Sequence, residues 1–83
     1  MKILYFARIR QLAGRGMEEV DVPGSVTTVR GLIDFLAEKD ERLAAAFADR
    51  RTVKAAVNQN HVALDAPLEG AREVAFFPPV TGG

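Results

Sequence analysis

The sequence contains no cysteine, a single histidine and a single serine. Without cysteine the chain can form no disulfide, no thiolate metal site and no iron–sulfur cluster, and it has no cysteine nucleophile. His61 is one imidazole where a metal site needs several ligands, and no acidic cluster surrounds it in the sequence, so we expect no bound metal. A Ser-His-acid triad would have to use Ser25 and His61, and the predicted fold gives no reason for them to meet.

Excess charge and long apolar runs are also missing. Eleven basic and eleven acidic side chains cancel, which argues against a nucleic-acid binder and removes the self-repulsion that keeps small proteins apart. No stretch approaches the roughly 20 apolar residues that span a bilayer, and residues 1–8 lack the features of a signal peptide. The lack of disulfides favours a reducing compartment, so we expect a cytoplasmic protein without membrane or nucleic-acid partners.

The first third of the chain is rich in strand signals. Residues 2–9 carry β-branched and aromatic side chains, and residues 17–22 alternate between apolar and polar. Between these two segments, Gly14-Arg15-Gly16 favours a turn, and it lacks the pattern of a phosphate-binding loop. The sequence therefore predicts two strands joined as a hairpin.

The middle of the chain changes to helical spacing. Apolar residues recur at i, i+3, i+4 and i+7 from residue 29 to residue 36, with Thr28 placed to cap the helix. Residues 41–48 suit a second, short helix that Asp40 could cap. We interpret Glu18-Glu19, Asp40-Glu41 and the Arg50-Arg51 pair as solvated charges.

The last third returns to strand signals. Residues 53–58, 61–64 and 73–77 read as strands, with a turn at 58–60 and a loop at 65–70. An opening hairpin, one main helix and three further strands predict an α+β fold of the β-grasp, or ubiquitin-like, type, with a mixed five-stranded sheet on one main helix. Eighty-three residues suit one domain, 1–83, with 78–83 as a protruding, flexible C-terminal tail. A ferredoxin-like fold is the competitor, and it would need two full helices.

Strand alternation assigns side chains to the two faces of this sheet. Ile3, Tyr5, Ala7 and Ile9 should share the face covered by the helix. Several apolar side chains fall on the opposite face, which suggests a partner surface. The predicted outer face collects Leu4, Phe6, Ala56, His61, Ala63, Ala75 and Phe77.

The last six residues are Pro78-Pro79-Val80-Thr81-Gly82-Gly83. Proline lacks an N–H and fixes φ, so Pro78 and Pro79 end the strand and favour a stiff, extended exit. Glycine has no side-chain bulk, so the following residues could thread a narrow channel and present an unhindered carboxylate. The alternative is that these residues are simply a flexible chain terminus without a function.

Two segments carry a family resemblance. The run from Phe76 to Gly83 resembles the C-terminal signature of the molybdopterin synthase small subunit, and residues 4–14 resemble the N-terminal pattern of that family. Residues 55–59 and 67–77 also fit, so the likeness spans the chain. The sequence departs from the family pattern at Asn60-His61, where an apolar residue or a Thr-Leu pair is common.

The resemblance implies a sulfur carrier in molybdenum cofactor biosynthesis. An E1-like enzyme would use ATP to adenylate Gly83, and a sulfur-transfer protein would convert it to a thiocarboxylate; no cofactor is bound. The carrier would insert its tail into a large subunit, as part of a heterotetramer of two small and two large subunits, and donate sulfur to cyclic pyranopterin monophosphate. It would count as an enzyme only as the sulfurtransferase small subunit, with the catalytic groups on the large subunit.

The resemblance also assigns site residues. Gly83 would carry sulfur, and Gly82 would give access to it. The remaining candidates would bind the partner: Phe6, His61, Phe77, Pro78, Pro79, Val80 and Thr81.

Three other functions stay open at this point. A thiamine-thiazole sulfur carrier shares the fold and the Gly-Gly end but is typically shorter and lacks the Phe-Phe-Pro-Pro run. A ubiquitin-like protein modifier would join Gly83 to lysines through the same adenylate. An interaction domain with an inert tail is the third.

Overall fold

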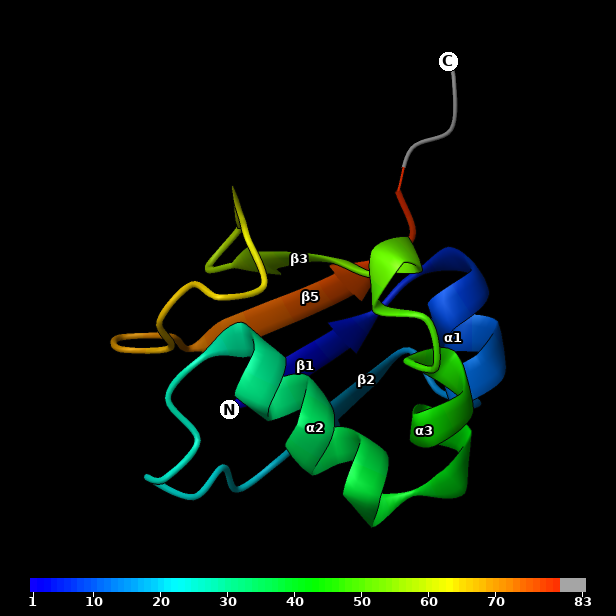
Figure 1. Ribbon diagram of the computed structural model, residues 1–83, viewed down its shortest axis with the longest axis horizontal. Helices are drawn as coiled ribbons and strands as arrows, with labels where there is room; N and C mark the ends of the chain where they lie inside the picture. The colour runs from blue at the N-terminus through cyan, green and yellow to red at the C-terminus, as the bar shows by residue number, and fades with distance from the viewer. Residues whose placement is uncertain (80–83) are drawn as a thin grey trace.

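Within residues 1–79, the part of the chain that the computed structural model describes, five strands form one mixed sheet. The elements in chain order are β1 (Lys2–Tyr5), α1 (Ala7–Ala13), β2 (Met17–Glu19), α2 (Val29–Lys39), α3 (Glu41–Ala46), the 3-10 helix η1 (Arg50–Thr52), β3 (Lys54–Val57), β4 (Asn60–Val62) and β5 (Glu73–Phe77). The strands lie in the order β2-β1-β5-β3-β4 (Figure 1). β1 and β5 run parallel, and the other neighbouring pairs are antiparallel.

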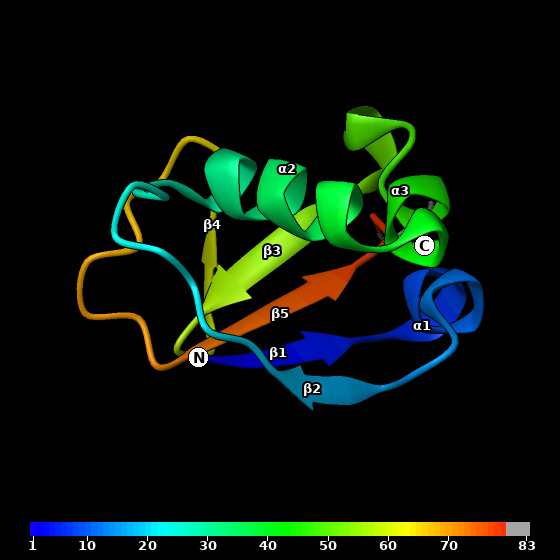
Figure 2. The same ribbon diagram turned by 90° about the horizontal axis from the view of Figure 1, so that it is seen from below.

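Helix α2 lies across one face of the sheet, as Figure 2 shows from below. The four positions predicted to face the sheet, Val29, Leu32, Ile33 and Leu36, are all fully buried. Burying such side chains contributes about 1.5–3 kcal/mol each, so this stripe fixes the helix on the sheet. A mixed sheet packed on one main helix confirms the arrangement that the sequence predicts.

Both predicted helix caps are present. The hydroxyl of Thr28 accepts a hydrogen bond from the Gly31 N–H at 3.0 Å, and the carboxylate of Asp40 accepts one from the Arg42 N–H at 2.7 Å. These side chains satisfy backbone donors that have no partner within the helix. No helix in the described part of the chain is both long and apolar enough to cross a bilayer.

The prediction of a strand over residues 2–9 is wrong beyond residue 5, because residues 7–13 form α1. Ile9 and Ala13 are four residues apart, one helical turn, and both are buried, which favours a helix against α3 and β5. Gly14 ends α1 in the left-handed conformation, with φ at 78°. β1 and β2 do pair antiparallel, but a helix joins them in place of a hairpin turn, and Ala7 is exposed.

Four other strands and helices exist as predicted but have different bounds. β2 ends at Glu19, α3 ends at Ala46, β3 covers Lys54–Val57, and β4 begins at Asn60 and ends at Val62. Between β3 and β4 the chain turns on two residues with positive φ, at 49° and 71°, which is the geometry that suits the twist of a two-residue hairpin. The final strand has the predicted bounds.

Three aromatic rings fill the core at one end of the sheet. Tyr5, Phe47 and Phe76 are nearly inaccessible, and their ring centroids lie 5.0–6.4 Å apart. At these separations tilted and edge-on rings attract one another beyond the effect of area burial. The cluster joins β1 and β5 to the segment after α3.

A chain of polar contacts starts at the hydroxyl of Tyr5. The hydroxyl donates to Glu18 Oε2 at 2.6 Å, Arg15 Nε donates to the same oxygen at 3.1 Å, and Arg15 Nη2 donates to Asp40 Oδ2 at 2.6 Å. Burial, followed by the hydrogen bond to Glu18, raises the pKa of Tyr5, so the phenol keeps its proton and stays a donor. Glu18 and Asp40 are therefore partners in a network, which corrects their interpretation as solvated charges.

We expect Asp40→Asn to destabilise the protein in a pH-dependent way. The Arg42 N–H, and then the Arg15 charge, hold the pKa of Asp40 below its ordinary value of 3.8. Because the folded state favours the ionised form, this stabilisation is present above pH 4 or so and disappears as the pH falls through the lowered pKa. The urea midpoint of the variant should lie below that of the native protein at pH 7, and the difference should shrink as the pH falls below 4. Glu38→Gln, on the exposed side of α2, is the control for loss of one negative charge. A difference in midpoint that stays constant as the pH is lowered from 7 into the acid range would contradict the assignment.

Candidate partner-docking face and tail exit

The face of the sheet that points away from α2 carries one row of side chains across all five strands. The registers pair Leu4 with Met17 and Ala75, and pair Ala56 with Ala75 and His61. The row therefore runs from β2 to β4 through the centre of the sheet. We call the surface built on this row, together with Phe6 and Phe77, the outer face.

The apolar part of the outer face lies at the edge where β1 and β5 end. Phe6, directly after β1, is 47% exposed, and its N–H donates to the carbonyl of Phe76 at 3.0 Å. Phe77 is half-buried at the end of β5, and its ring centroid lies 5.0 Å from that of His61. The structure thus brings the predicted docking residues Phe77 and His61 into contact and places Phe6 at the same edge.

Two predicted members of the outer face are not exposed, and one exposed residue was missed. Ala56 and Ala75 are only 7% and 8% exposed, because these small side chains lie between larger neighbours. Ala63, the other alanine of the predicted set, is exposed just after β4. Met17 is 57% exposed and faces outward beside Leu4. Only the register of β2 against β1, which the sequence does not state, shows that Met17 belongs to this surface.

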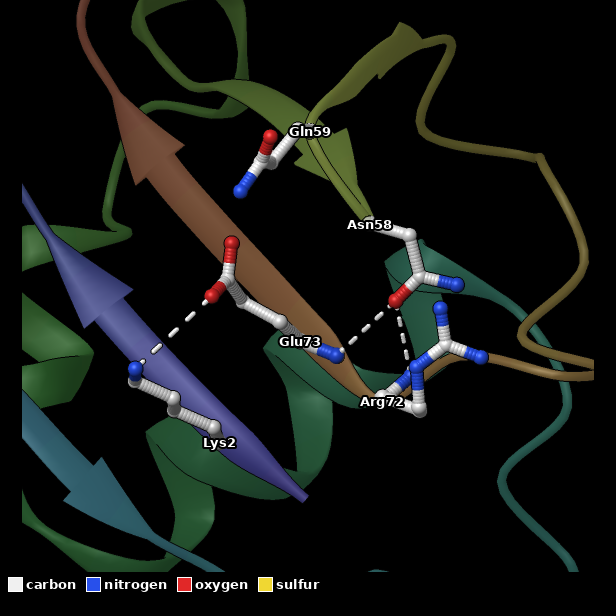
Figure 3. A pocket seen from close by; sticks show the side chains of 5 residues that line it. All are labelled: Lys2, Asn58, Gln59, Arg72 and Glu73. Atoms are coloured by element: carbon white, nitrogen blue, oxygen red, sulfur yellow. Dashed lines mark hydrogen bonds and ion pairs between the residues drawn. The ribbon is translucent and has the colours of Figure 1, made fainter.

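The opposite end of the outer face is polar, as the close view in Figure 3 shows. A shallow depression of about 370 Å³ is lined there by Lys2, Asn58, Gln59, Arg72 and Glu73. Asn58 Oδ1 accepts from the backbone N–H groups of Arg72 and Glu73 at 2.8 and 3.1 Å, and Lys2 Nζ lies 3.9 Å from a Glu73 oxygen. Asn58, predicted as the last residue of a strand and the first of a turn, thus connects the β3–β4 turn to the start of β5.

A second hollow lies at the start of the tail. It measures about 280 Å³, and Pro78 lines it together with residues of α1, α3 and the segment before β3. Arg8 and Asp49 lie among its lining residues, but most of the others are apolar. Figure 1 shows the same arrangement, with β5 ending beside α1 and η1.

The tail itself is only partly described. Pro78 and Pro79 follow β5 and are half-buried. The predicted roles of Val80, Thr81, Gly82 and Gly83 fall outside the described residues. The structure therefore places the start of the tail, at Pro78 and Pro79.

The remaining charged and polar candidates have simple positions. Arg50 Nη2 lies 2.8 Å from Asp34, and Arg51 Nε lies 3.1 Å from Asp49. The Arg51 side chain is still 91% exposed, so its interpretation as a solvated charge holds, although residues 50–52 form η1 and not a loop. The Asp49 hydrogen bond raises the pKa of Arg51. Within residues 1–79, no three histidine or acidic side chains gather as a metal site.

Comparison with known proteins assigns the family. The model of the ThiS family matches residues 3–83. The chain belongs to the ThiS family. A molybdopterin synthase sulfur carrier subunit of Escherichia coli (strain K12) is 43% identical over 83 residues, which cover all of this chain and 99% of the relative. That of Haemophilus influenzae is 31% identical with the same coverage.

Solved structures of ThiS-like proteins confirm the fold. A putative molybdopterin converting factor, subunit 1, from Pyrococcus furiosus matches with a TM-score of 0.70 and 38% identity, over 95% of each chain. SAMP1 from Haloferax volcanii matches with a TM-score of 0.72 and 28% identity, over 100% of this chain and 98% of that one. These likenesses confirm the predicted ubiquitin-like β-grasp, and the curated relatives support a sulfur-carrier role for the family member described here.

We expect neighbouring phenylalanines to differ sharply in their effect on stability. Phe76 is fully buried in the aromatic cluster, so Phe76→Ala should lower the free energy of unfolding by about 3–5 kcal/mol. Phe77 lies half-buried on the outer face, so Phe77→Ala should cost about 1–2 kcal/mol. Urea denaturation measures both, and equal losses would mean that Phe77 belongs to the core and not to a docking face.

Proposed function

We propose that the protein is the sulfur carrier subunit of a molybdopterin synthase and that Gly83 carries the sulfur. The family assignment and the full-length match to sulfur carrier subunits carry the proposal. The fold adds a physical reason, because β5 delivers the tail at the edge where Phe6 and Phe77 form an apolar surface. Residues 1–83 then act as one domain with residues 78–83 as its tail.

The proposed loading reaction takes place on a separate enzyme. The carboxylate of Gly83 attacks the α-phosphorus of ATP, pyrophosphate leaves, and a mixed anhydride with AMP forms. A persulfide sulfur of the sulfur-transfer protein then attacks the carbonyl carbon, and AMP leaves as an acyl disulfide forms. A thiol reductant attacks that disulfide at the sulfur of the sulfur-transfer protein, so the thiocarboxylate leaves with the electron pair and the thiol ends in a disulfide with the sulfur-transfer protein. Glycine at positions 82 and 83 keeps this carbonyl free of side-chain obstruction.

Delivery then depends on docking to the large subunit. The outer face packs on that subunit, and the tail extends into its pocket, where sulfur passes to cyclic pyranopterin monophosphate. Six residues, 78–83, reach at most about 20 Å, and two prolines stiffen the first part of that reach. Each dithiolene needs two sulfurs and therefore two loaded carriers, which fits an assembly of two small and two large subunits. The chain needs no bound cofactor for this role, and its part in the sulfurtransferase is to carry and position the sulfur.

One observation favours a second candidate. SAMP1 of Haloferax volcanii matches this chain over its whole length, and a second solved structure of that protein is described as small archaeal modifier protein 1. A protein modifier would use the same adenylate but would end as an amide on a lysine. Immunoblots for higher-mass conjugates in cells separate the two fates, because a carrier gives none.

We expect the protein isolated from cells to show a mass gain of about 16 Da, from exchange of one oxygen for sulfur in an acyl group. Adding one alanine after Gly83 should abolish that gain, because the activated carboxylate would sit on the wrong residue. Intact-mass spectrometry measures both, and unchanged thermal unfolding confirms that the fold is intact. Normal sulfur loading of an untrimmed, extended chain would refute the proposal.

We expect Phe77→Asp to weaken binding to the large subunit by tenfold or more, about 1.4 kcal/mol, because a charge would be buried in an apolar contact. Ala44→Asp adds the same charge at an exposed position of α3 and is the matched control. Isothermal titration calorimetry gives both dissociation constants. Equal affinities for the two variants would exclude Phe77 from the interface.

A further inference from the structure

The zero net charge of the protein hides an uneven distribution. The segments around the tail exit, 7–16 and 40–54, hold seven basic and three acidic side chains. Residues 58–73, which include the loop before β5, hold three acidic side chains and one basic. In Figure 1, α1, α3 and η1 lie at the end where the tail leaves, and the loop before β5 lies at the other end. The molecule is therefore polarised, with its positive end around the tail.

Two basic residues flank the start of the tail directly. Arg8, in the first turn of α1, lines the same hollow as Pro78. Lys54, at the start of β3, is the register partner of Phe77. Both side chains are exposed. Lys54 belongs to β3, on one side of β5, and Arg8 belongs to α1, which follows β1 on the other side of β5. We call Arg8 and Lys54 the cationic pair.

The cationic pair has no acidic partner within residues 1–79. In the same region, Arg15 pairs with Glu18 and Asp40, and Arg50 and Arg51 each have an aspartate within 3.1 Å. None of the ion pairs in the described chain includes Arg8 or Lys54. Their charges therefore remain available to a second molecule.

We propose that the cationic pair docks on acidic residues that rim the large-subunit pocket into which the tail inserts. This inference rests on the proposed function and adds the chemistry of the partner surface. If the tail extends fully into the partner, Gly83 would lie about 20 Å from the pair, so we assign the pair to docking and not to the sulfur chemistry. The tip of the tail carries an anionic carboxylate or thiocarboxylate, and the base of the tail is flanked by the cationic pair. A complementary partner has a positive pocket floor and a negative rim.

This arrangement acts mainly on the association rate. A polarised molecule turns its positive end toward a negative surface during encounter, so the tail arrives first. Exposed rim charges change the association rate constant and its salt dependence more than the dissociation rate. The apolar part of the outer face then provides most of the affinity.

The test measures binding kinetics to the purified large subunit by stopped-flow fluorescence, at ionic strengths from about 0.02 to 0.5 M, where the Debye length falls from over 20 Å to a few ångströms. The double variant Arg8→Glu with Lys54→Glu should lower the association rate constant on the order of tenfold at low salt. At high salt its association rate constant should approach that of the native protein. Arg8→Gln with Lys54→Gln should give an intermediate loss, and it serves as the test if the charge-reversed protein does not fold. Arg30→Glu with Lys39→Glu makes the same change in charge on α2 and is the control.

Each outcome decides the proposal. A graded, salt-sensitive loss that exceeds the loss in the control supports it. Equal loss in the control, an increased association rate, or a change confined to dissociation with no salt dependence would overturn it while leaving the carrier function intact. Failure of the native protein to bind the large subunit at any salt concentration would overturn both this proposal and the proposed function.

Discussion

The parallel pairing of β1 with β5 is the constraint on which the rest of the structure depends. It makes the first and last strands neighbours at the centre of the sheet, in a register that joins Lys2 to Glu73 and Tyr5 to Phe76. Because parallel strands end at the same edge, the chain leaves β1 at Phe6 and leaves β5 at Phe77 side by side. The apolar edge of the outer face and the start of the tail are consequences of this one pairing.

Tyr5 connects that pairing to the helices. Its ring packs with Phe47 and Phe76 in the core, and its hydroxyl begins the contacts that run through Glu18 and Arg15 to Asp40. The same carboxylate of Asp40 caps α3. One residue on the first strand therefore helps to hold the α1–β2 connection against the α2–α3 connection, and it does so beside the edge where the tail leaves.

The sequence predicted the features that depend on local spacing and missed those that depend on tertiary contact. The stripe of α2, the caps Thr28 and Asp40 and the bounds of β5 all follow from short-range patterns. Helix α1 was missed because its residues continue the apolar character of β1, and the packing of α1 against α3 is visible only in the fold. The buried state of Ala75 and the exposure of Met17 depend on strand register, which no local pattern specifies. Within the described residues, the apolar surface at the edge where β1 and β5 end was largely predictable from the sequence, and the positions of Arg8 and Lys54 beside Pro78 and Phe77 were not.

The small size of Ala56 and Ala75 has a consequence for the order of events. The alanine side chains project less from the middle of the outer face than the bulkier Met17, Leu4 and His61 beside them. Another protein can therefore approach the sheet closely there. The tail leaves from an edge of the same surface. A protein that covers the middle of the outer face therefore also controls access to the tail. In the proposed cycle the loading enzyme and the large subunit both need the tail. One tail serves one of them at a time, so in that cycle the carrier would have to dissociate from the loading enzyme before it delivered its sulfur.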